Sequence, residues 1–510
     1  MTSKSPRTSA SSTARTNPPP PFPIALTPED AAHAPSPSLF TSTSLTPPAL
    51  TPPTPAQLTA HLLLLSVFHA HRQRIINDPA IQTLFSSTDP DALYRAYVEA
   101  AVPRFTAWWH NLSKSAAWTP AHLPPLDVLV IWHSWLLNPR IYYDDIHRLG
   151  VDERMLEMRF PWADIIAAID VQTLAYTLGA EASTQFLALG VGPVCMESDM
   201  PGRESIHIPC PACDASLTVL ISAWHAEDFS TTCPCGTTTT RLSLRQHKLT
   251  HTHGPHMHGA ASPPTPSLLP STPLSTLLPL LTPPPTTPLA ALLHKFYPPV
   301  SAPPYAPTNL CLSSAVHRQS TFVVKMHNLG FLRSPFLAGT LRRAVRKYER
   351  FFVLFKALAG RTLVPTLDVD LVWHTQQLWP GGYEKWCRER AGRSIEHDDQ
   401  FGKDDLGVGF ALTQTEYKRR WWWAGWLGEA YGGCLCWRCE GKRDGDRGVD
   451  VKVAFWNVVE RRRVREMEGG MVEGEGAGKK EDAAGEDGVG ISLQGLEEAL
   501  EEERVSCWLW

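Results

Sequence analysis

Residues 124–142 read PPLDVLVIWHSWLLNPRIY, and residues 365–383 read PTLDVDLVWHTQQLWPGGY. Nine of the 19 aligned positions are identical, including an Asp, a Trp-His pair and a Pro-x-x-Tyr in one register. Similar apolar composition alone would not align these residue types, so the repeat predicts two related helical units. We expect Asp127 and Asp368 to cap the two repeat helices and the prolines at 139 and 380 to end them.

The bulk composition is that of a globular protein with added extended segments. The chain has 510 residues, of which 43% are apolar and 19% charged, enough for two or three domains. The formal net charge of −4 is too near zero to favour bulk attraction to nucleic acid. No run of about 18 uncharged apolar residues occurs, so no membrane span is expected. The N-terminus lacks the apolar core of a signal peptide, which favours a cytoplasmic location, with the nucleus as the alternative.

Helical periodicity and start signals place most of the secondary structure. Thr54-Pro55 and Asp89-Pro90 each resemble an N-cap followed by proline at the first helical position. We predict helices over 55–77, 139–149, 161–188 and 341–358, in addition to the two repeat helices. Short alternating apolar runs between residues 204 and 241 predict a small β-rich insert instead.

These patterns predict a mainly α-helical protein made of six consecutive segments. The segments are a disordered Pro/Ser/Thr-rich N-terminus at 1–53, a first helical unit at 54–195, a zinc-ribbon-like β insert at 196–245, a His-rich and then Pro-rich linker at 246–305, a second helical unit at 306–440, and a mostly disordered Gly-rich and acidic tail at 441–510. We also expect the two helical units to pack against each other, with each Trp-His helix at a shared core.

The insert carries the most specific chemical signal. Cys210-Pro-Ala-Cys213 and Cys233-Pro-Cys235 supply four thiols on predicted hairpins, a pattern that favours a structural Zn²⁺ site. The second pair is one residue shorter than the usual C-x-x-C, so either His225 or His207 is an alternative ligand. A closed site with four protein ligands would have no open position for catalysis, and its binding energy would help to fold the insert.

Three further groups have weaker chemical signals. The tract of His247, His251, His253, His256 and His258 lies in a Gly/Pro/Thr context, which favours a solvated segment. Cys434, Cys436 and Cys439 form a second, weaker candidate metal cluster that would need a fourth ligand such as Cys387 or His397, and a packed cluster of reduced thiols is the alternative. The basic run 461–465 favours a solvated helix face over a nuclear-import signal or a nucleic-acid contact.

The candidate catalytic residues lie on the second repeat helix and in the polar loop that follows it. Asp370 and His374 are four residues apart and share one helical face with Gln377, so they could bind a metal or position a water molecule. His397-x-Asp399 adds a further His and carboxylate in a polar loop. The first copy has leucines at 129 and 136 in place of Asp370 and Gln377, so any chemistry should be confined to the second copy. The alternative, which we favour, is that these residues have a structural role: Asp368 caps the helix, and Trp373 and His374 pack at the edge of the core.

The chain resembles the glycine-rich-domain-containing-protein-like family of plants and fungi, formerly a domain of unknown function. The resemblance rests on TLDVDLVWHTQQLWPGGYEKWC, on the residues 395–399 and on YGGCLCWRC at 431–439, and it covers roughly residues 58–440. This chain departs from the family pattern D-x-D-L-x-W-H-x-H-Q-L at Gln376, a position where the family commonly has a second His. Some fungal relatives bear a 2-oxoglutarate dioxygenase label, whereas the plant relatives suggest interaction roles.

We therefore expect a non-enzymatic interaction or scaffold protein with a structural metal site, because the common catalytic templates are absent. Its protein partners cannot be identified from the sequence. The first alternative is a metal-dependent enzyme that uses Asp370, His374, His397 and Asp399. The second alternative is a nucleic-acid-associated protein acting through the insert and the basic run.

Overall fold

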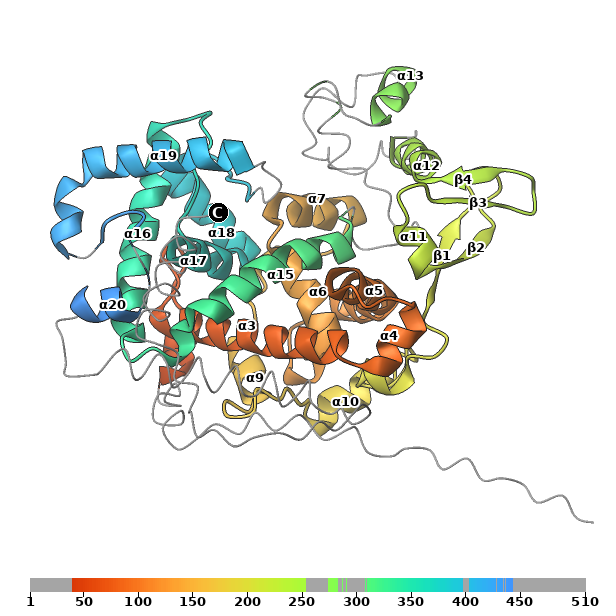
Figure 1. Ribbon diagram of the computed structural model, residues 1–510, viewed down its shortest axis with the longest axis horizontal. Helices are drawn as coiled ribbons and strands as arrows, with labels where there is room; N and C mark the ends of the chain where they lie inside the picture. Colours follow the sequence, from red (N-terminus) through yellow and green to blue (C-terminus); the bar gives the residue numbers. More distant parts are fainter. Residues whose placement is uncertain are drawn as a thin grey trace, which may run out of the picture.

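The computed structural model describes residues 39–253, 274–282, 287, 290, 308, 310–397, 403–427, 429–433, 435 and 437–443. The architecture is mainly helical with a small β-rich insert to one side, which confirms the predicted fold class (Figure 1). The apolar side chains of both halves and of the insert form one continuous hydrophobic cluster.

The helices before the insert are α2 (Ser42–Leu45), α3 (Pro55–Ile76), α4 (Pro79–Phe85), α5 (Pro90–Lys114), α6 (Leu126–Leu136), α7 (Pro139–Leu149), α8 (Arg154–Glu157), α9 (Trp162–Ala167) and α10 (Ala180–Leu187). The predicted start of α3 is confirmed, because Thr54 and Gln57 form a reciprocal capping box and Pro55 occupies the first turn. Asp89 caps α5 in the same way through its carboxylate, which accepts from the backbone N–H groups of Asp91 and Ala92.

The insert contains two antiparallel hairpins, β1 (Ser205–Pro209) with β2 (Ser216–Leu220) and β3 (Ser230–Thr232) with β4 (Thr238–Thr240), and two helices, α11 (Ile221–His225) and α12 (Arg241–His253). In β1 and β2 buried and exposed side chains alternate, so one face of the hairpin packs inward. Helix α12 runs past residue 245, where we predicted the insert to end. The short helix α13 (Leu274–Leu277) lies within the predicted linker.

The helices after the linker are α15 (Leu312–Leu329), α16 (Leu337–Ala357), α17 (Leu367–Gln377), α18 (Pro380–Ala391), α19 (Lys403–Arg420) and α20 (Trp437–Arg443). The two repeat segments fold alike, as an 11-residue helix (α6 or α17) followed by a helix that begins at the repeated proline (α7 or α18). Helix α15 crosses the middle of the molecule and packs on α3, α5 and α6, so the first helix of the second half contacts the core of the first (Figure 1).

Our assignment of Asp127 and Asp368 as helix caps was wrong. Each lies inside the first turn of its helix and is buried, with only 3% and 1% of its surface exposed. Asp127 accepts two hydrogen bonds from the Arg104 guanidinium of α5, and Asp368 pairs with the Lys347 ammonium of α16. Each repeat helix is therefore joined to the preceding long helix by a buried ion pair.

Two other local predictions differ from the structure. The predicted helix 161–188 is broken between α9 and α10, because the Asp170 carboxylate accepts the backbone N–H groups of Gln172 and Thr173 and forms a turn. The N-terminal segment predicted to be disordered up to residue 53 is described from residue 39. Leu45 there is buried, and the Thr54 hydroxyl donates to the carbonyl of Ser44 at 2.5 Å.

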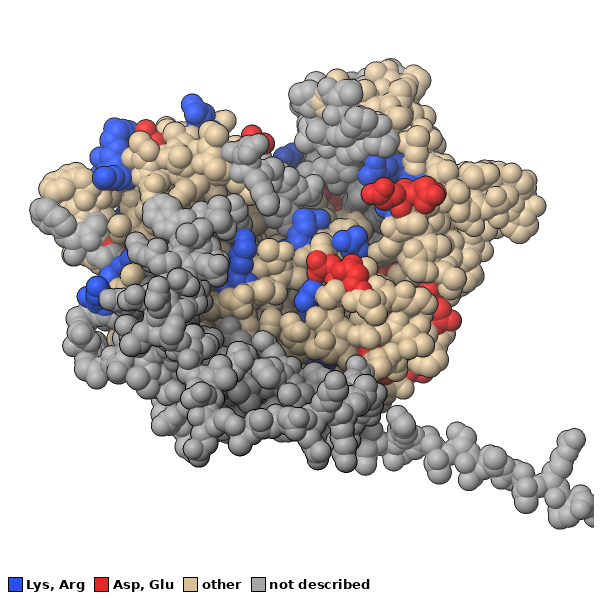
Figure 2. Space-filling model, viewed as in Figure 1, with Lys and Arg blue, Asp and Glu red and all other residues tan. Residues whose placement is uncertain are grey.

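The surface carries both signs of charge. Figure 2 shows basic and acidic side chains interspersed over the face in view, without a single large basic area. Over the part of the chain that the structure describes, no helix has the length and apolar character that crossing a membrane requires.

We expect Lys347→Met to destabilise the protein by about 3–5 kcal/mol, because it leaves the Asp368 carboxylate buried without its partner. The free energy of unfolding is measured by urea denaturation with tryptophan fluorescence. The double variant Lys347→Met/Asp368→Asn should recover most of this loss, since neither charge then remains. Arg342→Gln, at an exposed position of the same helix, is the control. Equal losses in the single and double variants would show that the ion pair is not what holds α17 to α16.

Candidate metal centre

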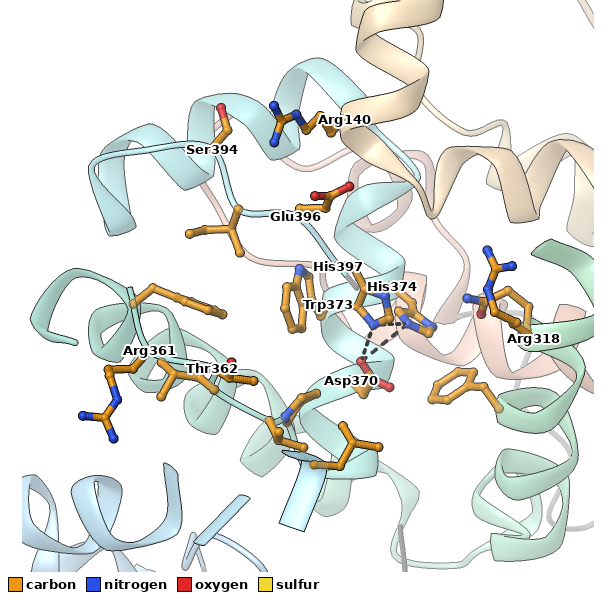
Figure 3. Close-up of a pocket in the computed structure, with 18 of the residues that line it drawn as sticks. Arg140, Arg318, Arg361, Thr362, Asp370, Trp373, His374, Ser394, Glu396 and His397 are labelled. Atoms are coloured by element: carbon orange, nitrogen blue, oxygen red, sulfur yellow. Dashed lines mark hydrogen bonds and ion pairs between the residues drawn. The ribbon is translucent and has the colours of Figure 1, made fainter. Parts of the chain in front are cut away.

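Helix α17 and the segment after α18 bring one carboxylate and two imidazoles together. Asp370 and His374 lie one helical turn apart on α17, and His397 reaches them from the chain that follows α18 (Figure 3). The Nε2 atoms of His374 and His397 are 3.0 Å apart. Asp370 Oδ1 lies 3.2 Å from Nε2 of His397 and 3.5 Å from Nε2 of His374. Three potential ligand atoms thus form a compact triangle.

The dimensions of this triangle fit a metal ion. An ion bound at about 2.0–2.2 Å by imidazole nitrogen and carboxylate oxygen, with angles of 90–110°, holds its donor atoms roughly 3.0–3.5 Å apart. The three observed separations lie in this range. All three donors stand on one side of such an ion, which leaves its other coordination positions open.

Burial sets the protonation states that metal binding needs. Desolvation lowers the pKa of His374 well below its usual value, so its imidazole is neutral at physiological pH. Burial alone would raise the pKa of Asp370, but the neighbouring His374 and His397 and the nearby Lys325 outweigh it and hold this pKa below its usual value. A neutral imidazole beside an ionised carboxylate is the form in which these residues bind metals.

The triangle lies in the wall of a pocket of about 570 Å³. Helix α15, the loop at 360–365 and the segment 393–397 form its sides (Figure 3). The charged side chains that line it are Arg140, Arg318, Lys325, Arg361, Asp370, Arg393 and Glu396. Of these, only Asp370 was predicted from the sequence, and the two cations of α15, Arg318 and Lys325, were not. Their spacing with Phe322 (i, i+4, i+7) marks one face of a helix, but that spacing alone does not indicate a pocket.

Not every predicted residue joins this site. Gln377 is buried but is not among the residues that line the pocket. Gln376, which stands where a second His is common in the family pattern, donates to the Thr51 carbonyl at 3.4 Å and does not line the pocket. The second histidine of the cluster is instead His397. Asp399 lies outside the described residues.

The first repeat has a different arrangement at the same positions. Leu129 stands where the second copy has Asp370, and Nε2 of His133 lies 2.9 Å from Nε2 of His61 on α3. Nδ1 of His61 lies 2.8 Å from the Thr375 hydroxyl of α17. Because that hydroxyl donates to the Leu371 carbonyl, His61 must donate to it, and His133 must donate to His61. This hydrogen-bonded chain, which has no carboxylate, joins the two repeat helices.

The insert brings its four cysteines together. Cys210 and Cys213 flank the turn of the first hairpin, and Cys233 and Cys235 flank the turn of the second. The sulfur atoms of Cys210 and Cys235 are 3.7 Å apart, those of Cys213 and Cys233 are 3.6 Å apart, and all four lie within 4.8 Å of one another. Sulfurs bound tetrahedrally at about 2.3 Å are roughly 3.8 Å apart, so this arrangement could hold a metal ion.

The short C-x-C turn is accommodated by the glycine that follows it. Gly236 has φ = +87° and donates its N–H to the Cys233 carbonyl, which folds the turn back after one intervening residue. The structure places the alternative ligands elsewhere. His207 lies against the Thr218 hydroxyl of β2, and His225 lies 3.6 Å from the Glu99 carboxylate of α5.

The remaining candidates are only partly described. Cys439 lies in α20, whereas Cys434 and Cys436 fall outside the described residues. His247 lies in α12 with Nε2 3.1 Å from the Asp214 carboxylate, and α12 extends to His253, so the start of the predicted solvated tract is helical. His256, His258 and the basic run 461–465 also lie outside the described residues.

Residues 301–385 match the family model described as glycine-rich domain-containing protein-like. Two proteins of Arabidopsis thaliana are similar over 130 residues, glycine-rich domain-containing protein 1 at 37% identity and glycine-rich domain-containing protein 2 at 33%. The aligned part is 23% of this chain, and the chain spans only 15% and 16% of the length of these relatives. No solved structure matches the chain. The predicted resemblance is confirmed for residues 301–385, which are similar to this family.

The matched segment covers part of the candidate centre. It includes α15, α16 and α17 and ends within α18, so it contains Asp370 and His374. His397 follows the matched segment.

Proposed function

We propose that this protein is a metal-dependent enzyme. Asp370, His374 and His397 would hold one divalent transition-metal ion at the wall of the 570 Å³ pocket. The observation that supports this proposal is the triangle of donor atoms, with separations of 3.0, 3.2 and 3.5 Å, on residues that line the pocket. A metal ion held by only three protein ligands keeps positions for water and substrate, unlike a closed structural site.

The donor set indicates which metals suit the centre. Two imidazoles and one carboxylate on one side of the ion are the ligands of mononuclear non-haem iron(II) centres, and similar sets bind Zn²⁺. Bound there, such an ion would supply Lewis acidity or, as iron(II), a place for oxygen chemistry. Burial keeps the His374 imidazole neutral, and the neighbouring His374, His397 and Lys325 keep the Asp370 carboxylate ionised. The rings of Phe322 and Trp373 lie 4.4 Å and 4.9 Å from those of His374 and His397 and cover them on one side.

We further propose that the four cysteines of the insert hold a structural Zn²⁺ ion. Two sulfur pairs at 3.6 and 3.7 Å support this, because a thiolate set with four protein ligands is typical of closed zinc sites. The ion would tie together the turns of the two short hairpins, which form separate sheets.

An interaction or scaffold role, with unidentified protein partners, and a nucleic-acid role through the insert and the basic run both stay predictions. The enzyme proposal takes precedence because the triad of Asp370, His374 and His397 lies in the wall of a pocket, whereas the cysteine cluster supports a structural role only.

The triad proposal predicts that full-length protein purified with added iron(II), without oxygen, binds one metal ion that Asp370→Asn or His374→Gln removes. Each substitution takes away a ligand that contributes about 3 kcal/mol of binding free energy, so metal affinity should fall by about a hundredfold or more. Metal content is measured by mass spectrometry after desalting.

The matched controls are Asp228→Asn and His110→Gln, which make the same chemical changes at exposed positions. Both should keep the metal. Circular dichroism checks that all variants fold. If folded Asp370→Asn and His374→Gln proteins retain as much metal as the controls, the triad is not a metal site and the enzyme proposal fails.

The insert proposal predicts that Cys213→Ser lowers the zinc content by one equivalent while leaving the triad metal in place. Cys213 is exposed, so the substitution removes a ligand without opening a cavity. Cys311→Ser, a cysteine outside the cluster, is the control and should not change the zinc content. A Cys213→Ser protein with full zinc content would rule out the four-thiolate site.

A further inference from the structure

We propose that the ligand of this pocket is a small organic anion, whose carboxylate or phosphate group lies between the metal ion and the cationic face of α15 formed by Arg318 and Lys325, and whose apolar part packs beside Trp373. This inference rests on the proposed metal site and names the class of substrate that would use it. The charges that line the pocket, the position of the α15 face and the apolar lining support it.

Basic side chains outnumber acidic ones in the lining of the pocket. Five basic side chains face it against two acidic ones, and one of the acidic ones, Asp370, is itself a proposed metal ligand. A divalent ion would more than neutralise Asp370. The centre would then carry excess positive charge next to the cations of α15, in a wall partly shielded from water. Such a site favours an anion, because unscreened charges interact more strongly away from bulk solvent.

The α15 face is placed to meet an anion at the metal. Arg318, Phe322 and Lys325 occur at i, i+4 and i+7, so they lie along one side of the helix. Phe322 packs against His374 at 4.4 Å between ring centroids, which fixes this side toward the triad. Lys325 is half-buried and interacts electrostatically with Asp370. Figure 3 shows Arg318 on α15, on the side of the triad where His374 lies.

The other lining residues suit an apolar body of the ligand. Phe355, Leu363, Val364, Trp373 and Ile395 all line the pocket, and they are buried in the core around it. A free inorganic anion would leave this part of a 570 Å³ pocket unused. A compact ligand with one charged group and one aromatic or aliphatic group matches both parts, as most small-molecule sites combine an apolar lining with a few fixed polar groups.

The experiment uses full-length protein loaded with Co²⁺, whose visible absorption reports changes of coordination. Benzoate and phenyl phosphate are the anionic probes, and benzamide is the uncharged probe of the same shape as benzoate. We expect at least one of the two anions to shift the cobalt spectrum. Its affinity should be about tenfold or more higher than that of benzamide, because it makes a charge-assisted contact that benzamide cannot make. Comparison of the two anions tells a carboxylate site from a phosphate site.

Arg318→Gln and Lys325→Gln should each weaken binding of the preferred anion about tenfold at unchanged cobalt content. Arg318→Lys, which keeps the charge, should lose less. Arg342→Gln, an exposed arginine of α16 that does not line the pocket, should have no effect. An unchanged cobalt content and an unchanged circular dichroism spectrum establish that each variant is folded and keeps its metal.

The two proposals fail in different ways. Protein that takes up no cobalt at the triad overturns the metal site and the anion inference together. Protein that binds cobalt but responds equally to benzamide and the anions, or whose anion affinity is unchanged in both Gln variants, overturns the anion inference alone and leaves the metal site standing.

Discussion

The ion pair between Asp368 and Lys347 fixes the position of the helix on which the candidate centre depends. Both side chains are almost fully buried, and a buried charge that lost its partner would cost several kcal/mol. Helix α17 therefore cannot rotate or slide along α16 without a large penalty. Asp370 follows Asp368 by two residues, about 200° around the helix. When Asp368 faces α16, Asp370 must face away from it, toward α15 and the pocket.

The same constraint explains what the sequence could and could not predict. Signals carried by neighbouring residues were sufficient for α3, α5 and α7, since Thr54 and Asp89 cap the adjacent backbone and Pro139 occupies the first turn of α7. The role of Asp127 and Asp368 could not be found in this way. An Asp near the start of a helix resembles a cap, and its true partner lies 23 residues away in Arg104 or 21 residues away in Lys347.

The candidate centre was predictable only in part. The spacing of Asp370 and His374 indicated a shared face, but the position of His397 depends on how α18 returns the chain to α17. Within that return the Tyr383 hydroxyl accepts from the Trp373 indole and donates to the Ile395 carbonyl, two residues before His397. The repeated Trp and Tyr, which we took as shape features, therefore hold the backbone that carries a proposed ligand. The cations on α15 come from a helix more than 40 residues earlier, which no local pattern connects to α17.

The difference between the two copies gives the strongest physical argument for a metal ion in one of them. In the first copy His133 is buried without a carboxylate, and burial lowers its pKa to about 3. His61 accepts its hydrogen bond, so the arrangement is neutral and satisfied. In the second copy Asp370 replaces a leucine, and burying that ionised carboxylate is costly unless it is compensated. The two imidazoles and the half-buried Lys325 offset that cost and hold the pKa of Asp370 below its usual value. A divalent cation would add to this stabilisation and use all three donors at once, which a leucine at this position could not do.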